Sequence, residues 1–239
     1  MGNVDNRRIA KNTLLLYMRM GLIMIISLWA SRVVLSTLGE TDFGLYNVIG
    51  GIVVAFSFLN GVMNSSCNRY YATQLGRQDY EALHQVFKVN VTIFLILAAA
   101  ILLLSESVGL WIMERKMNIP AQRLTACRWV YQLSIFSFLC SVVAIPYRAI
   151  ITAKEKMKVY AYCSVMEAAL KLGIVFLLSI SPIDRLVFYA LLMLLVSLAT
   201  NGFYILYCHR CYPECRYDWH CDKALAREIV SFNGWGVLG

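Results

Sequence analysis

Long apolar blocks separated by short polar stretches dominate the chain, at about 12–37, 44–67, 88–113, 125–150, 158–181 and 186–208. Each block is close to the roughly 20 residues that an α-helix needs to cross a hydrocarbon core about 30 Å thick. A seventh stretch begins near Ile229 and runs to Gly239. The strands of a membrane β-barrel would alternate apolar and polar positions over about ten residues, and these blocks do not. The pattern predicts an all-α, polytopic transmembrane helix bundle with six complete spans and the start of a seventh.

Composition agrees with a membrane protein. Hydrophobic residues make up 59% of the chain and the mean hydropathy is +0.62, whereas soluble domains are only about 45–50% apolar. The first apolar block is longer than the roughly 7–15 residues of a signal-peptide core, and five more blocks follow it. It is therefore expected to be a span that stays in the protein, with Met1 as the true start.

Basic residues gather in alternate loops and explain the formal net charge of +8. Fourteen lie on the side of the N-terminus and four on the other side, which is the bias typical of cytoplasmic loops. The two groups are Arg7, Arg8, Lys11, Arg69, Arg77, Lys88, Arg148, Lys154, Lys156, Lys158, Arg210, Arg216, Lys223 and Arg227 against Arg115, Lys116, Arg123 and Arg185. We expect a multi-pass protein of a bacterial inner membrane with a cytoplasmic N-terminus, membrane lipids around it and no nucleic-acid partner.

Four of the eight cysteines crowd into one predicted cytoplasmic loop together with two histidines. They are Cys208, Cys211, Cys215 and Cys221, with His209 and His220. A C-x2-C pair followed by further Cys and His can bind zinc, but the remaining spacings fit no standard zinc ribbon. Reduced thiols without a metal are the favoured interpretation.

Besides the basic residues already counted with the loops, six charged residues lie inside the apolar blocks: Arg19, Arg32, Glu106, Arg128, Glu167 and Lys171. A charge at the centre of a bilayer costs at least about 2.5–3.5 kcal/mol, so such residues usually mark a functional site. Four of the six are positive and two are negative. This balance favours an anionic cargo in a polytopic transporter.

Arg19 and Arg32 are thirteen residues apart on one predicted helix. At about 100° per residue they differ by about 220°, so on a straight helix they cannot share a face. At most one of them would line a given cavity. Arg32 is close enough to the end of the helix to reach the lipid headgroups instead.

Glu106 and Arg128 occupy matching depths on two successive antiparallel spans. Their opposite signs favour an ion pair between these spans. In an alternative arrangement, Glu106 neutralises Arg32 and the pair rearranges during gating.

Glu167 and Lys171 are the deepest charges, and their i,i+4 spacing places them on one helical face. Tyr160 and Ser164 continue this polar stripe toward the cytoplasm. The two charges either neutralise each other without touching cargo or line a cavity. In both cases they must face protein or water rather than lipid.

Uncharged polar residues form a second stripe on the second span: Ser57, Asn60, Asn64 and Asn68. They either form hydrogen bonds between helices or line a wet cavity open to the cytoplasm. We expect Asn60 and Asn64 to lie across from the Glu167 and Lys171 face.

Several segments together resemble the bacterial polysaccharide flippases of the Wzx type. They are Arg7–Leu16, Arg32–Tyr46, Gly61–Tyr70, Ile119–Pro120, Pro146–Met157, Asp184–Ala190 and Ser231–Trp235. That group belongs to the superfamily of the multidrug and toxin extruders and the lipid II flippase. Members have about 12 to 14 helices in two lobes that alternate access to a central cavity. By this resemblance, residues 1–222 are a six-helix N-terminal lobe and residues 223–239 the start of a second lobe that is cut off.

The resemblance implies that the cargo is an undecaprenyl-diphosphate-linked oligosaccharide, with glycosyltransferases and a polysaccharide polymerase as candidate partners. Arg32, Arg19 and Lys171 are the candidates to hold the diphosphate, with Glu167, Asn60 and Asn64 as further cavity candidates. The alternative is an ion-coupled multidrug exporter of the same superfamily, for which only Glu106 and Glu167 offer acidic groups. No nucleotide-binding loop, metalloprotease motif, nucleophile elbow or dinucleotide motif is present. We therefore expect no catalytic residues, no cofactor and no enzymatic activity.

Overall fold

The computed structural model describes residues 2–55, 57–117, 119–178, 184–215 and 229, and the regular structure in these ranges is helical. The main helices are α1 (Gly2–Leu38), α2 (Glu40–Val54), α3 (Phe58–Gly76), α4 (Tyr80–Leu104), α5 (Leu110–Lys116), α6 (Leu124–Val143), α7 (Ile145–Ala153), α8 (Met157–Leu178) and α9 (Arg185–Cys211). Five stretches of the described residues are long and apolar enough to cross a membrane. The chain is an all-α membrane helix bundle, as its apolar blocks predict.

The second apolar block is not one continuous helix. α2 ends at Val54 and α3 begins at Phe58, and the Ser57 hydroxyl donates a hydrogen bond to the Val54 carbonyl oxygen at 2.6 Å. Because of this break, neither half counts among the five candidate spans. The count of six spans therefore stays a prediction. The seventh span and the boundary at residues 222 and 223 fall outside the described residues, apart from Ile229.

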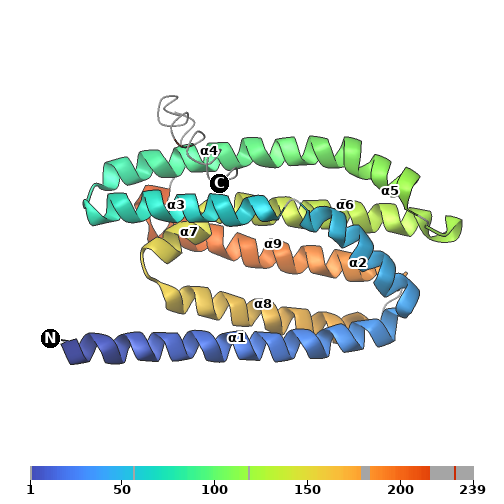
Figure 1. Ribbon diagram of the computed structural model, residues 1–239, viewed down its shortest axis with the longest axis horizontal. Helices are drawn as coiled ribbons and strands as arrows, with labels where there is room; N and C mark the ends of the chain where they lie inside the picture. Colours follow the sequence, from blue (N-terminus) through green and yellow to red (C-terminus); the bar gives the residue numbers. More distant parts are fainter. Residues whose placement is uncertain (1, 56, 118, 179–183, 216–228, 230–239) are drawn as a thin grey trace.

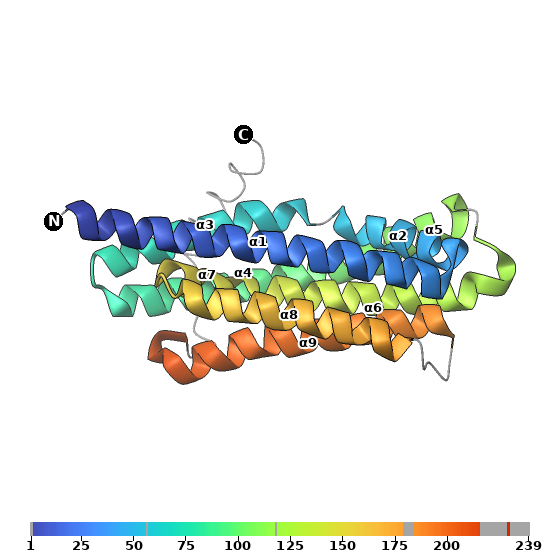
Figure 2. The ribbon, with the colours of Figure 1, turned by 90° about the horizontal axis from the view of Figure 1, so that it is seen from below.

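The helices pack in layers, with α1 and α8 side by side along one face (Figure 1). α6 and α9 form the middle of the bundle, and α4 lies on the face opposite α1 (Figure 1). The view from below shows α1 running alongside α8 over most of its length (Figure 2). Only 6% of the most apolar part of α1, within Met20–Leu38, is buried, so α1 lies at the periphery of the described bundle.

Aromatic side chains fill the core between α3, α4 and α7. The Phe87 ring meets the Tyr147 ring edge-on at 5.2 Å between centroids, and it lies 6.2 Å from the Tyr71 ring. All three are buried. Aromatic pairs in this geometry contribute about 0.5–1.5 kcal/mol beyond the burial of their area. Tyr147 thus fixes α7 in the core and with it the position of the next residue, Arg148.

Two basic residues that the sequence analysis assigned to loops, Arg148 and Lys88, lie inside helices. α6 ends at Val143, and Pro146 lies in the first turn of α7, where a proline costs no helical hydrogen bond. The apolar block therefore continues past the break, and Arg148 lies within a helix instead of a loop. Lys88 is likewise inside α4, with only 6% of its surface exposed.

Ion pairs fasten the connections between helices at both ends of the bundle. At the end where α1 meets α2, Arg123 Nη2 lies 2.9 Å from Asp42 Oδ2, and Arg123 also pairs with Asp184, the N-cap of α9. Burial raises the pKa of the Asp42 carboxyl, and Arg123 acts in the opposite direction. At the other end, Lys154 Nζ lies 3.1 Å from Glu214 Oε1. Ion pairs thus stabilise the connections at both ends of the bundle, and apolar packing stabilises its core.

A π-helical turn at Ser105–Gly109 interrupts the long span that begins with α4. The buried Tyr131 hydroxyl on α6 donates a hydrogen bond to the Ser105 carbonyl oxygen at 2.7 Å. A Cβ atom added at Gly109 would lie 1.8 Å from that hydroxyl oxygen. Glycine is therefore required at this position for α4 and α6 to approach each other.

Replacing Gly109 with alanine should destabilise the protein by about 1–3 kcal/mol, the usual cost of overfilling a packed core. A second substitution, Tyr131→Phe, removes the clashing oxygen and should restore part of the loss. The restoration is only partial, because the ring carbon that bears the hydroxyl still lies 3.0 Å from the new Cβ. The thermal midpoint and membrane abundance of the single and double variants measure this.

Gly202→Ala on α9 is the matched control, since its new Cβ meets no atom within 4 Å. The control should keep the wild-type thermal midpoint or raise it slightly, because alanine favours a helix more than glycine does. A wild-type midpoint for Gly109→Ala as well would contradict the proposed close approach.

Candidate functional site

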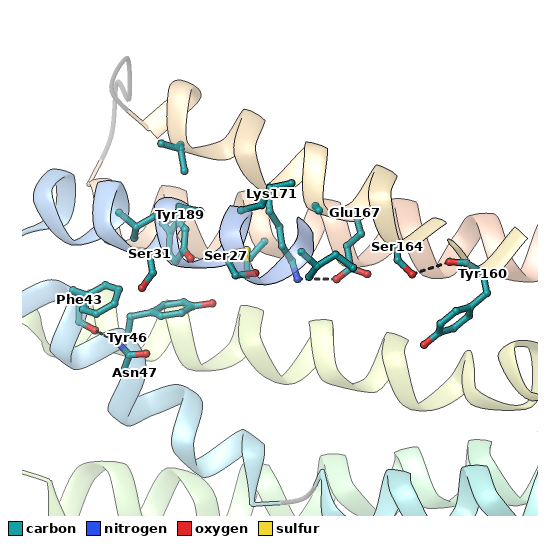
Figure 3. A pocket seen from close by; sticks show the side chains of 17 residues that line it. Ser27, Ser31, Phe43, Tyr46, Asn47, Tyr160, Ser164, Glu167, Lys171 and Tyr189 are labelled. Atoms are coloured by element: carbon teal, nitrogen blue, oxygen red, sulfur yellow. Dashed lines mark hydrogen bonds and ion pairs between the residues drawn. The ribbon is translucent and has the colours of Figure 1, made fainter. Parts of the chain in front are cut away.

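The polar stripe of α8 forms one wall of a cavity of about 400 Å³, called here the α8 cavity. Tyr160, Ser164, Glu167 and Lys171 line it (Figure 3). Lys171 Nζ donates a hydrogen bond to Glu167 Oε1 at 2.7 Å, and 41% of each side chain is exposed. The ion pair expected from the i,i+4 spacing is present, and it faces a cavity whose walls carry polar side chains among apolar ones.

The opposite wall of the α8 cavity comes from α1, α2 and α9. Ser27 and Ser31 contribute hydroxyl groups from α1, and Tyr46 and Asn47 come from α2 (Figure 3). The Tyr46 ring packs edge-on against Tyr189 at 4.8 Å. These residues lie across from Glu167 and Lys171, in the place where the sequence predicted Asn60 and Asn64.

A smaller cavity of about 200 Å³, called here the arginine cavity, lies on the other side of the ion pair. Glu167 and Lys171 line both cavities, and the arginine cavity adds Arg148. Arg148 Nη2 donates a hydrogen bond to Asn201 Oδ1 at 2.7 Å and to the Ser141 carbonyl oxygen at 3.2 Å. The guanidinium carbon lies 5.6 Å from the centre of the Tyr204 ring, within the range of a cation–π contact. A second cation is thus held near Lys171.

A third cavity of about 480 Å³, called here the asparagine cavity, lies between α3, α7 and α8. Asn60, Asn64 and Asn68 line it from one face of α3. Arg148 belongs to its lining as well as to that of the arginine cavity. The side-chain oxygens of Asn60 and Asn68 are buried without a hydrogen-bond partner in the described part of the chain. A cavity wall was one of the two interpretations of this stripe, but Asn60 and Asn64 were expected across from Glu167 and Lys171, which do not line this cavity.

The three cavities adjoin one another, because they share lining residues, and they are called here the cavity region. Tyr160 lines the α8 and asparagine cavities, and Arg148 lines the arginine and asparagine cavities. The charged groups that the described residues place in this region are Arg148, Lys171 and Glu167. Two cations against one anion leave the described lining with one positive charge.

The other predicted charges lie elsewhere. Arg32 is exposed and does not line any of the three cavities, whereas its neighbour Ser31 does. The side chain of Arg19 lies outside the described part of the structure. Glu106 Oε2 accepts a hydrogen bond from Gln132 Nε2 at 3.1 Å, one helical turn beyond Arg128 on α6. The roles predicted for these four residues in binding or gating stay predictions.

Sequence reasoning missed Arg148 as a site residue. The signal was present in the apolar run Ile145–Ala153, where Arg148 is the only charge and its neighbours on both sides are apolar. Asn201 and Tyr204, which hold the guanidinium, come from the charge-free part of α9, which was read only as a span. Their contribution depends on how α6, α7 and α9 meet.

The cysteine-rich segment offers no metal site in the part that the structure describes. Within that part, no group of three or more His, Cys, Asp or Glu side chains is placed to hold a metal ion. Cys208 and Cys215 are buried and Cys211 is exposed, all three as free thiols. Cys221 and His220 lie outside the described residues.

Comparison with known proteins places this geometry in a family. A family model described as "Polysaccharide biosynthesis protein" matches residues 9–239. A search of curated proteins gives no match. Solved structures with a similar fold include a point mutant of a MATE protein, with a TM-score of 0.74 and 14% identity over 95% of this chain. A MATE in complex with MaD3S has a TM-score of 0.73 and 15% identity over 96% of this chain.

A third similar structure is that of a MOP superfamily transporter from Pyrococcus furiosus, whose description reports a binding pocket of reverse polarity suggesting a different function. Its TM-score is 0.72, with 15% identity over 95% of this chain. The chain spans about half the length of these transporters, 52% in each case. At this level of identity the likeness shows a shared fold.

Neutralising Glu167 and Lys171 together should be tolerated better than neutralising either alone. Glu167→Gln or Lys171→Met leaves one charge unpaired, whereas the double variant leaves none. The cost of each single change should be below the about 3–5 kcal/mol of a fully buried pair, because both side chains are partly open to the cavity. Membrane abundance and the thermal midpoint of the four proteins give the coupling between the two sites.

Lys158→Met, an exposed position on the same helix, is the control for loss of a positive charge. Additive losses in the double variant would show that the two residues do not act as a pair.

Proposed function

The chain belongs to the polysaccharide biosynthesis protein family, and on this basis we propose that it moves an undecaprenyl-diphosphate-linked oligosaccharide across the inner membrane for surface polysaccharide synthesis. The supporting observation is the group of three adjoining cavities with Arg148, Lys171 and Glu167 on its walls. A lipid-linked diphosphate carries negative charge into this region. Coulombic attraction to a cation is stronger there than in water, because the surrounding helices form a low-dielectric wall.

The cavities serve as the passage for the polar part of the cargo. The sugar and the diphosphate cannot cross hydrocarbon without losing their water, so they need polar partners along the route. The three cavities offer hydroxyl, amide and charged groups, and the lipid tail can stay outside in the bilayer. In family members of this kind, two halves rock around such a site to alternate its access. The N-terminus would be cytoplasmic, in keeping with the positive-inside bias of the sequence.

An ion-coupled drug exporter is the alternative that the fold leaves open, since two of the similar structures are MATE proteins. Such an exporter needs an acidic residue that is free to exchange a proton or a sodium ion for a cationic drug. Here the Glu167 carboxylate is already bound by Lys171 at 2.7 Å. Arg148, the further cation that the described residues place on the cavity walls, would repel a cationic drug. These features favour the anionic cargo.

The Glu167→Gln/Lys171→Met double variant tests the function in the cell. Expressed from its own gene, it should reach the wild-type abundance but display less than about a tenth of the wild-type surface polymer, the loss expected when one charged hydrogen bond to the cargo is removed. Deleting the gene should abolish the polymer and cause lipid-linked oligosaccharide to accumulate on the cytoplasmic leaflet. Polymer display and membrane abundance are measured together.

Lys158→Met serves again as the control and should display normal polymer. Normal polymer in the deletion strain, together with increased sensitivity to cationic drugs, would contradict the flippase and support the exporter.

A further inference from the structure

We propose that Arg148 divides the cargo site into two parts, with the diphosphate in the arginine cavity and the first sugar in the asparagine cavity. This inference rests on the proposed function and assigns the two ends of the cargo to specific residues. The two chemical groups are joined directly in the cargo, so their binding sites must adjoin. Arg148 meets this requirement because it lines both cavities.

Arg148 has the geometry of an anion-binding group. No carboxylate among the described residues forms an ion pair with its guanidinium, although the side chain is half-buried. Nη2 makes both of its hydrogen bonds to protein oxygens, and Nε is buried without a partner among the described residues. Buried cations are normally paired with an anion, because moving an ion out of water costs several kcal/mol. A well-placed partner offsets about this much. A guanidinium held by its neighbours, with donors left over, suits the paired oxygens of a phosphate.

Asn201 and Tyr204 hold Arg148 without neutralising it. The Asn201 side-chain oxygen accepts from Nη2 at 2.7 Å, and the Tyr204 ring lies under the guanidinium at 5.6 Å. Asn201 Nδ2 is itself fixed by the Ser197 hydroxyl oxygen at 3.0 Å. These contacts fix the orientation of the guanidinium group and leave its positive charge unpaired by a carboxylate. An ion pair with a carboxylate would have neutralised that charge.

The asparagine cavity has the composition of a sugar site. Apart from Arg148, its described lining is uncharged and includes three asparagine amides from one face of α3. The oxygens of Asn60 and Asn68 are buried acceptors without a donor in the described part of the chain. Sugar hydroxyls are donors as well as acceptors, so they suit a wall of amide side chains. Tyr160 adds an aromatic side chain to the same wall.

The size of the asparagine cavity also fits a sugar. Its volume of about 480 Å³ lies within the range of about 300–1,000 Å³ of small-molecule sites. The arginine cavity, at about 200 Å³, is the smaller of the two and contains the three charged groups. The two cavities therefore differ in charge and volume: the smaller one has three charged side chains and suits the diphosphate, and the larger one has Arg148 as its one charged side chain among the described residues and suits the sugar.

The experiment measures the binding of two lipids to the purified protein in detergent. One probe is a polyprenyl diphosphate, and the other is the same lipid bearing the first sugar of the host's polysaccharide. The wild-type protein should bind the sugar-bearing probe about tenfold more tightly than the bare probe, as expected for one or two extra hydrogen bonds. This difference between the probes reports on the sugar site alone.

The Asn60→Ala/Asn64→Ala variant should lose the advantage of the sugar-bearing probe and bind the bare probe within about twofold of the wild-type value. Arg148→Lys keeps the charge but loses the planar guanidinium group with its paired donors, so it should weaken the binding of both probes by about tenfold. Ser65→Ala, an exposed position beside Asn64 on α3, is the matched control and should change neither value. Thermal midpoints confirm that each variant is folded before it is compared.

The outcomes separate this inference from the function on which it rests. If the asparagine variant keeps the full advantage of the sugar-bearing probe, the sugar lies elsewhere and the division is wrong, although the transport function stands. If the wild-type protein binds both probes equally, the division is wrong in the same way. If the wild-type protein binds neither probe, the proposed function fails and the division fails with it.

Discussion

Polar and charged side chains inside a membrane helix bundle must find protein partners or a wet cavity, because hydrocarbon offers them neither hydrogen bonds nor counter-charge. This constraint explains the arrangement around α8. Glu167 and Lys171 bind each other at 2.7 Å and face a cavity of about 400 Å³. Arg148 is held by Asn201 and by the Tyr204 ring at the edge of a second cavity. These charged residues therefore lie on cavity walls inside the bundle, where protein groups or water can contact them, and not on a surface that faces lipid.

Interruptions in the helices position this region. The break before Pro146 lets α7 turn into the aromatic core, where Tyr147 packs on Phe87 and places Arg148 on the cavity wall. The break between α2 and α3 separates Tyr46, which faces the α8 cavity, from Asn60, which faces the asparagine cavity. The ion pairs of Arg123 and Lys154 then fix the ends of the bundle. The ends of the bundle are fixed by ion pairs, and the aromatic core between α3, α4 and α7 is closely packed. The cavities beside α7 and α8 are therefore the part of the bundle with room for a ligand.

The sequence predicted the features that depend on local spacing. Hydropathy over about 20 residues gave the helical membrane fold, and an i,i+4 spacing gave the Glu167–Lys171 pair. Features that depend on how distant helices meet were not predicted. Asn60 and Asn64 share a face of α3 as expected, but α3 packs against α7 and α4, and the two asparagines line a separate cavity beside α7. The sequence analysis counted Arg148 among the basic residues of a cytoplasmic loop, and only the packing of α7 shows that it lies in a helix on a cavity wall.

The central claim is that the cavities beside α7 and α8 hold the diphosphate end of a lipid-linked sugar. Photo-crosslinking in native membranes tests it most directly, with a cargo lipid that carries a photoreactive group next to the diphosphate. The account predicts that the label attaches to Ile145–Ala153 and Met157–Leu178, and that unlabelled cargo competes it away. Label confined to the outward-facing apolar surface of α4, with none on α7 or α8, would contradict the account.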